Sequence, residues 1–286
     1  MYHTYIRGLI LMVENSLFNQ PLMNKYLKKY KKEFKLTHTK KEAVFKWIKR
    51  LENGDLRDEV SNYGLFSRLI LETILGYDYE ENIEENVKED YGRGFSEFAI
   101  KKDGKKFMVI ELKGSEADLD KPQQRKNDKR TPVDQAFDYA KRSGDINWIL
   151  VSNYDEFRLY NWHKKQHQYI SFKAEELKDP ETFKSFMLVL SKFSTVEHNL
   201  IEKLVSKTIF VERDLEAEFY KLFNETRLML IAELEHIHPE FTREESVHYS
   251  QLILNRYIFI CFAEDLGLLP GEVSVEAYQT LLKMMN

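Results

Sequence analysis

Cysteine is almost absent from this chain, since Cys261 is the only one among 286 residues. One thiol excludes an internal disulfide framework and a zinc cluster built from cysteines. Such sparse cysteine usage is typical of proteins that work in a reducing compartment. The sequence therefore favours the cytoplasm.

Long apolar runs are also missing. No segment approaches the roughly 20 apolar residues that a membrane-spanning helix requires. The first sixteen residues, MYHTYIRGLILMVENS, contain a short apolar run, but Arg7 and Glu14 bracket it and no small-residue cleavage site follows. We interpret this stretch as a helix and expect a soluble protein with no membrane partner.

The chain lacks an overall basic charge as well, because its formal net charge is −4. A nucleic-acid surface would therefore have to be local. Two segments are candidates: KKYKKEFK at 28–35 and KPQQRKNDKR at 121–130. Each segment taken alone is equally compatible with a solvated surface, so both interpretations stay open.

The order of apolar patterns predicts two structural regions. The hydrophobic content of 43% is enough for a real core. Residues 1 to about 76 have helical periodicity, and the period changes to two from about residue 95. After 178–183 the pattern is helical again. We predict an α/β sandwich within residues 1–176 and an all-α unit over 177–286.

One predicted helix carries an acidic residue in an unusual place. The segment GDLRDEVSNYGLFSRLILETILGY has an apolar face through Tyr63, Phe66, Ile70 and Ile74. Glu59 lies at the head of this face, where an acid without a partner would be costly.

A hairpin is predicted from two strand-like runs, FSEFAI and KFMVIELKG, on either side of KKDGK. Its register decides whether Glu97 and Glu111 meet. A two-residue Asp103-Gly104 loop would leave the two carboxylates on opposite faces. A three-residue loop over 102–104 would make them diagonal neighbours. If they form one site, the longer loop or an equivalent bulge is required.

Charged residues follow a buried strand in this hairpin. Glu111 and Lys113 are two residues apart and share a face, directly after apolar strand formers. With Glu97 nearby, they would suit a hard cation such as Mg²⁺, which binds carboxylates and substrate phosphate. Such a metal activates water and offsets charge on a phosphodiester, while Lys113 would orient the water or stabilise the transition state.

The next helix is predicted over TPVDQAFDYAKRSG, with Thr131 at its N-cap and Pro132 in its first turn. Gln135 and Tyr139 are four residues apart, so both could point towards the end of the sheet. A packed tyrosine and a capping amide are the alternative interpretation.

Together these residues resemble the PD-(D/E)xK nuclease superfamily, and this resemblance implies a mixed central sheet flanked by helices. In that resemblance Glu97 takes the place of the family's first aspartate, with Asp90 as the fallback. Glu111 and Lys113 match the acidic-x-lysine pair, and Gln135 and Tyr139 match the helix motif QxxxY. Glu59 is similar to the glutamate that such nucleases supply from the preceding helix. The resemblance implies metal binding by Glu59, Glu97 and Glu111, with Mg²⁺ replaceable by Mn²⁺.

More specifically, the chain resembles the N-terminal part of type IIG restriction-modification enzymes. Five landmarks carry this resemblance: ILGYD, VIELKG, TPVDQAFDYA, WILVSNYDEFRLYN and LNRYIFICFAEDLGLL. In that family a helical connector, a methyltransferase and a target-recognition domain follow the nuclease. The chain shows no NPPY-type motif and no S-adenosylmethionine loop, so we expect those domains in a longer protein or a partner chain.

We therefore expect a Mg²⁺-dependent restriction endonuclease that acts on double-stranded DNA, with a transient dimer on DNA as one way to cut both strands. Sequence specificity would come from the absent domains. The alternatives are a repair-type exonuclease of the same superfamily and a degenerate nuclease fold that only binds DNA or a partner. Phosphate contacts are expected from the second basic segment, through Lys121, Arg125, Lys126, Lys129 and Arg130.

Overall fold

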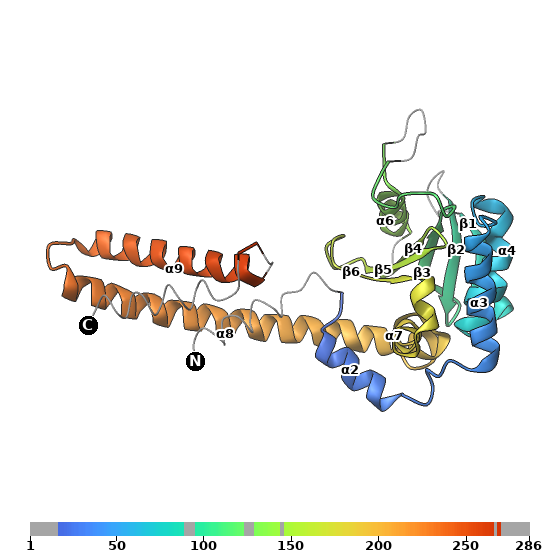
Figure 1. The fold of residues 1–286 in the computed structure, drawn as a ribbon, viewed down its shortest axis with the longest axis horizontal. Coiled ribbons are helices and arrows are strands. Elements are labelled where there is room, and N and C mark those ends of the chain that lie inside the picture. Colours follow the sequence, from blue (N-terminus) through green and yellow to red (C-terminus); the bar gives the residue numbers. More distant parts are fainter. Residues whose placement is uncertain (1–16, 89–94, 123–128, 144–145, 266–267, 270–286) are drawn as a thin grey trace. The chain divides into compact units, whose positions relative to one another are not determined.

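The computed structural model describes residues 17–88, 95–122, 129–143, 146–265 and 268–269 (Figure 1). These residues fall into two compact units. The larger unit comprises residues 15–208, and the smaller one includes residues 209–265. The domain division predicted between residues 176 and 177 stays a prediction.

A six-stranded sheet in the order β1-β2-β3-β4-β5-β6 forms the centre of the larger unit. Every neighbouring pair is antiparallel except β3 and β4, which are parallel. The predicted mixed sheet is thus confirmed. The strand bounds are β1 Ile83–Lys88, β2 Phe95–Lys102, β3 Lys105–Leu112, β4 Trp148–Ser152, β5 Glu156–Asn161 and β6 Tyr169–Lys173.

Helices cover both faces of this sheet (Figure 1). Helix α6 crosses one face between the parallel strands β3 and β4, as such a connection requires. On the opposite face Phe66 packs against Phe98 and Phe157, and Phe157 also contacts Phe186. The helices of the larger unit are α2 Gln20–Lys29, α3 His38–Glu52, η1 Val60–Asn62, α4 Tyr63–Phe66, η2 Ser67–Ile74, α5 Tyr79–Asn82, α6 Pro132–Arg142, η3 Glu175–Lys178, α7 Pro180–Leu190 and η4 Phe193–Glu197.

The β2–β3 hairpin has a two-residue loop and a bulge. Lys102 pairs with Lys105, and both Asp103 and Gly104 have positive φ values of 49° and 73°. Of the two loops considered, the structure therefore has the two-residue one. The required bulge is present, because the register shifts beyond Ile100 and leaves Phe107 as the extra residue of β3. Phe98 then pairs with Ile110, and continuing this register by one residue sets Glu97 opposite Glu111.

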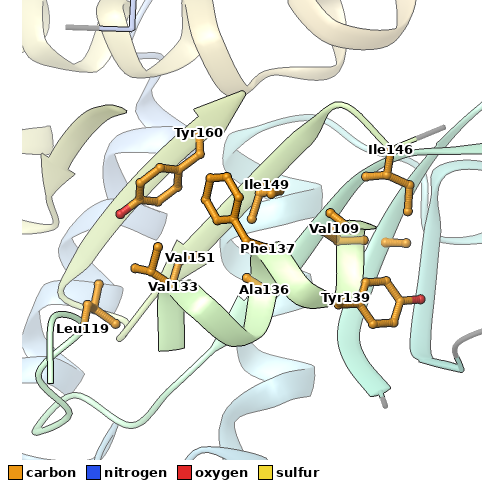
Figure 2. Close-up of a cluster of buried hydrophobic side chains, with 12 residues drawn as sticks. Val109, Leu119, Val133, Ala136, Phe137, Tyr139, Ile146, Ile149, Val151 and Tyr160 are labelled. Atoms are coloured by element: carbon orange, nitrogen blue, oxygen red, sulfur yellow. The ribbon is translucent and has the colours of Figure 1, made fainter. Parts of the chain in front are cut away.

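Helix α6 begins with the predicted cap. The Thr131 side chain accepts a hydrogen bond from the Asp134 amide, and the Asp134 carboxylate accepts one from the Thr131 amide. One side of the helix buries Ala136, Phe137 and Tyr139 against the sheet (Figure 2). Because Val109 joins the same cluster, strand alternation sets Glu111 on the face of β3 that α6 covers.

The helix predicted over 54–77 differs from expectation in its type. Only Tyr63–Phe66 is α-helical, and Ser67–Ile74 is a π-helix. The Thr73 hydroxyl donates to the Arg68 carbonyl five residues earlier, which fits the wider turn. The predicted apolar face is confirmed, since Phe66, Ile70 and Ile74 are fully buried.

The described residues from 200 to 265 form two helices, as predicted. Helix α8 (Leu200–Ile237) starts in the larger unit, and α9 (Arg243–Asp265) lies in the smaller one. Among the described residues, no helix is long and apolar enough to span a membrane.

Candidate active site

The side chain of Lys113 lies among three carboxylates directly after β3. Its Nζ donates to Glu111 Oε1 at 2.7 Å and to the Leu112 carbonyl at 2.7 Å. Glu59 Oε2 is 3.4 Å away and Glu97 Oε1 is 3.6 Å away. The structure thus brings together four residues predicted for one site. They come from the segment before α4, from β2 and from the end of β3.

Burial makes this cluster electrostatically strong. The Lys113 side chain is 2% exposed and that of Glu111 is 7% exposed. Burial alone lowers the pKa of Lys113, but attraction to Glu111, Glu97 and Glu59 outweighs it and leaves the pKa raised. Lys113 therefore stays charged at neutral pH.

The surroundings of Glu97 raise the pKa of its carboxyl group. Burial and the neighbouring charge of Glu111 raise the pKa of Glu97 to about 9, although Lys113 acts in the opposite direction. Its Oε2 accepts a hydrogen bond from the Leu112 amide at 3.1 Å. The carboxyl group of Glu97 therefore holds its proton more tightly than an exposed glutamate does.

Two tyrosines hold Glu59. The Tyr63 hydroxyl donates to the Glu59 carboxylate at 3.1 Å, and the Tyr154 hydroxyl donates to the Glu59 carbonyl at 2.6 Å. Burial, followed by the charges of Glu97 and Glu59, raises the pKa of Tyr63, so its hydroxyl keeps the proton that it donates. Sequence reasoning did not single out Tyr154, which is 95 residues away from Glu59.

Tyr154 lies in a strained turn between β4 and β5. Its φ of 69° is in the left-handed region that bulky residues rarely adopt, and its side chain is fully buried. The turn also contacts Lys113, because the Lys113 amide donates to the Ser152 carbonyl at 2.8 Å. This turn therefore fixes the backbone on two sides of the cluster.

Gly114, directly after Lys113, is closely packed against a neighbouring segment. A Cβ atom on Gly114 would lie 1.9 Å from the Arg57 carbonyl oxygen. The Ser115 amide donates to the Leu56 carbonyl at 2.9 Å, and Arg57 pairs with Glu116 at 2.8 Å. The loop after Lys113 is thus bound to the segment that precedes Glu59.

The predicted helix motif lies beside the sheet, with different environments for its two residues. Tyr139 is 3% exposed and belongs to the hydrophobic cluster of α6 (Figure 2). The buried Nε2 of Gln135 has no hydrogen-bond partner among the described residues. The burial of Tyr139 fits its interpretation as a packed tyrosine. The roles of Gln135 and Tyr139 in a site stay predictions.

The residue types of the cluster fit a hard divalent cation, because three carboxylates lie within 3.6 Å of one point. As arranged, however, that point is the ammonium nitrogen of Lys113. Within the described ranges no group of three His, Cys, Asp or Glu side chains has the arrangement of a metal site. A cation held at this point by Glu59, Glu97 and Glu111 would take the place of the Lys113 ammonium group.

The predicted phosphate-binding residues are only partly described. Arg125, Lys126 and the fallback ligand Asp90 lie outside the described residues. Lys121 pairs with Asp118 at 2.7 Å, and Arg130 pairs with Asp138 at 2.8 Å. Lys129 is exposed.

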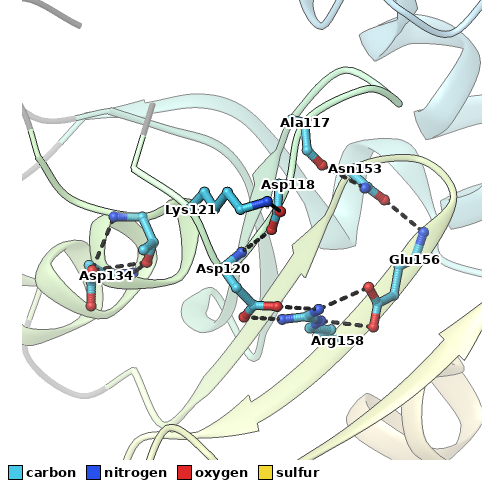
Figure 3. Close-up of polar contacts among 9 residues, drawn as sticks. Ala117, Asp118, Asp120, Lys121, Asp134, Asn153, Glu156 and Arg158 are labelled. Carbon is cyan, nitrogen blue, oxygen red and sulfur yellow. Dashed lines mark hydrogen bonds and ion pairs between the residues drawn. The ribbon is translucent and has the colours of Figure 1, made fainter. Parts of the chain in front are cut away.

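A second polar cluster was missed from the sequence (Figure 3). The side chain of Arg158 on β5 is only 9% exposed, which is unusual for an arginine. Its guanidinium donates to both Asp120 oxygens, at 2.7 and 2.9 Å, and to Glu156 at 2.8 Å. The Asn153 amide holds the same loop through the Ala117 carbonyl. This cluster fixes the loop that leads from Lys113 to Lys121.

A mixed sheet flanked by helices, with a buried glutamate–lysine cluster at the end of a central strand, defines an α/β domain with a candidate active site. The MmeI N-terminal domain model matches residues 23–207, more than half of the chain. The chain belongs to this family, the N-terminal region of a type IIG restriction enzyme. No curated protein and no solved structure matches the chain.

Proposed function

We propose that this chain contains the Mg²⁺-dependent DNA endonuclease domain of a type IIG restriction-modification system, with a PD-(D/E)xK site. The observation that carries the proposal is the convergence of Glu59, Glu97 and Glu111 on Lys113 at the end of β3. Family membership supports the same function.

Each residue of the cluster would have a defined role. Glu97 and Glu111, with Glu59, would hold the metal through carboxylate oxygens. Bound Mg²⁺ would activate water and offset negative charge on the phosphodiester. Lys113 would orient the attacking water and contribute a positive charge that stabilises the transition state. Gln135 and Tyr139 would support the site or contact the DNA backbone.

The substrate would be double-stranded DNA. Lys121, Lys129 and Arg130 would bind phosphates without reading sequence, together with Arg125 and Lys126. Sequence recognition and methylation would belong to further domains, in a longer protein or a partner chain. A transient dimer on DNA would supply a second cleavage centre, and the cytoplasm is the expected location.

A plasmid assay tests this function. Supercoiled and linear DNA are incubated with Mg²⁺ or Mn²⁺ and the intact protein, Glu111→Gln or Lys113→Met. We expect metal-dependent nicking by the intact protein and loss of nicking in both variants, with DNA binding retained. The matched control is Glu181→Gln, which changes an exposed glutamate on α7. It should nick like the intact protein.

Two outcomes would contradict the proposal. Equal nicking by all variants would mean that another site or a contaminant cuts the DNA. Cleavage that requires a DNA end would instead support a repair-type exonuclease of the same superfamily.

A catalytically degenerate binding module is the second candidate. The observation that favours it is the position of Lys113, whose ammonium fills the point where the carboxylates converge. Metal titration by calorimetry separates the two candidates. A heat signal that disappears in Glu111→Gln supports the nuclease, whereas DNA binding without any metal binding supports the binding module.

A further inference from the structure

We propose that the segment 25–50, which comprises most of α2, the following turn and most of α3, is a second nucleic-acid phosphate-binding surface outside the candidate active site. This segment contains eleven Lys and Arg residues but only two acids, Glu33 and Glu42. Its net charge is therefore +9, in a chain whose total is −4. Positive charge is therefore concentrated in this segment, although the net charge of the whole chain is negative.

Apart from Lys40, which is half-buried against Met187, the lysines of this segment, hereafter the basic segment, are open to solvent and mostly free of acids. Glu42 pairs with His38, and Arg50 lies 3.8 Å from Asp55. Lys29 and Lys41 lie over aromatic rings. The remaining exposed lysines form no ion pair with another described residue, and they are Lys25, Lys28, Lys31, Lys32, Lys35, Lys46 and Lys49.

This arrangement weakens the helix that carries it. Lys25 is three residues from Lys28 and four from Lys29, so these ammonium groups are neighbours on one side of α2. Like charges at these spacings each cost a helix a few tenths of a kcal/mol, and no acid alternates with them. A polyanion bound to this side would turn the repulsion into attraction.

The basic segment approaches the candidate active site at one end. Trp47 Nε1 of α3 donates to the Tyr154 carbonyl at 2.9 Å, and the Tyr154 hydroxyl holds the Glu59 backbone. Lys46, Lys49 and Arg50 therefore lie at the end of α3 that is bonded to this turn. A nucleic acid at the active site would reach the basic segment without leaving the larger unit.

The size of the segment suits a duplex. Helix α3 has 15 residues and is therefore about 22 Å long. A DNA duplex carries one phosphate charge per about 1.7 Å, so about thirteen phosphates would pass along this length. The charges on α3 are enough to neutralise several of them.

A membrane surface fits these helices less well. A basic helix that lies on a membrane inserts an apolar face between the lipids. Here that face is occupied, since Met23, Tyr26, Val44, Trp47 and Ile48 are buried in the protein. Among the large apolar side chains of α2 and α3, Phe45 is the exposed one, at 46%. A polyanion without a lipid phase is the matching partner.

The proposal goes beyond the proposed nuclease, because binding can be measured without cleavage. Affinity for a short DNA duplex is measured in EDTA over a range of salt concentrations. The test variants are Lys25→Gln/Lys28→Gln/Lys32→Gln on the α2 side and Lys46→Gln/Lys49→Gln on α3. Each phosphate contact that is lost should lower the slope of log affinity against log salt by about one. We expect both variants to bind more weakly at every salt concentration.

The control removes equal charge elsewhere. Lys165, Lys173 and Lys221 are exposed and form no described ion pair. Their triple Gln variant has the net charge of the α2 variant, and we expect it to bind DNA like the intact protein. Equal weakening in this control would mean that only net charge matters and would overturn the proposal.

Three further results separate the outcomes. An intact protein that does not bind DNA at low salt would overturn the proposal. Binding to phosphatidylserine vesicles but not to DNA, lost in the α2 variant, would assign the segment to a membrane instead. If the intact protein binds DNA through these lysines but never nicks it, the basic segment stands and the nuclease proposal fails.

Discussion

Lys113 is the residue on which the charge balance of the site depends. It is the one cation beside Glu59, Glu97 and Glu111 among the described residues. Removing one partner of a buried ion pair typically costs about 3–5 kcal/mol, because the remaining charge loses its compensation. We expect Lys113→Met to reduce the free energy of unfolding by an amount of this order in urea titrations at neutral pH.

A surface lysine provides the comparison for that experiment. Lys178 pairs with Glu175 at 3.4 Å, with the glutamate 77% exposed. Exposed pairs contribute about 0–1 kcal/mol, so Lys178→Met should be nearly neutral. Equal losses in the two variants would mean that the carboxylates around Lys113 do not depend on it.

The protonation of Glu97 predicts a pH dependence of stability. Its pKa is raised from 4.5 to about 9 in the folded protein, so the folded state binds a proton that the unfolded state has released. The stabilisation is complete below pH 4.5 and is lost as the pH rises through about 9. In EDTA, Glu97→Gln should therefore gain stability relative to the intact protein across this window. A difference that stays constant with pH would contradict the assignment.

At the residue scale, sequence reasoning predicted the residues that meet at Lys113. It did not predict the residues that hold them in place. Glu97, Glu111 and Lys113 could be found because strand alternation and short spacing bring them together. Tyr154 and Arg158 could not, because their partners Glu59 and Asp120 are 95 and 38 residues away. No local pattern encodes a hydrogen bond across that separation.

The turn between β4 and β5 gives a prediction at the level of an element. Tyr154→Phe removes only the hydroxyl that holds the Glu59 backbone. Tyr77→Phe is the matched control, since Tyr77 is also buried and its hydroxyl donates to the Leu190 carbonyl at 2.7 Å. Both variants should lose about 1 kcal/mol of stability. Only Tyr154→Phe should slow plasmid nicking at saturating DNA, and equal nicking rates would show that the turn does not position the site.

The loop after β3 gives a second prediction at the level of an element. Gly114→Ala would drive a Cβ atom into the Arg57 carbonyl, which is backbone and has little room to move. Overpacking of this kind typically costs about 1–3 kcal/mol. We expect a lower urea midpoint together with weaker nicking. Gly64→Ala is the control, because its Cβ meets nothing within 4 Å.

Among the elements, the β2–β3 hairpin and the capped α6 could be predicted, because alternation and capping residues are local signals. Strand β1 was missed, since its sequence IEENVK is acidic and lacks alternation. The π-helix at Ser67–Ile74 was also missed, because the four-residue spacing of Phe66, Ile70 and Ile74 fits a turn of either helix type. Only the hydrogen bonds distinguish them.

On the scale of the whole molecule, the larger unit should be an independent folding unit. Residues 15–208 contain the sheet, the hydrophobic cores on both faces and the candidate site. A fragment with these bounds should unfold in a single cooperative thermal transition and keep the nicking activity of the intact chain. A fragment without a cooperative transition would show that residues 1–14 or 209–286 are needed for folding.

The bulge at Phe107 means that the hairpin contains one spare residue, and this affects which changes of length the protein tolerates. Deleting Phe107 would remove the bulge and leave Phe98 paired with Ile110, so Glu97 and Glu111 would stay opposite each other. Deleting Lys101 from the other strand would require a second extra residue on β3 or move one glutamate to the wrong face. The two strands of this hairpin therefore differ in their tolerance of deletions. Natural changes in chain length should accumulate in β3 more than in β2.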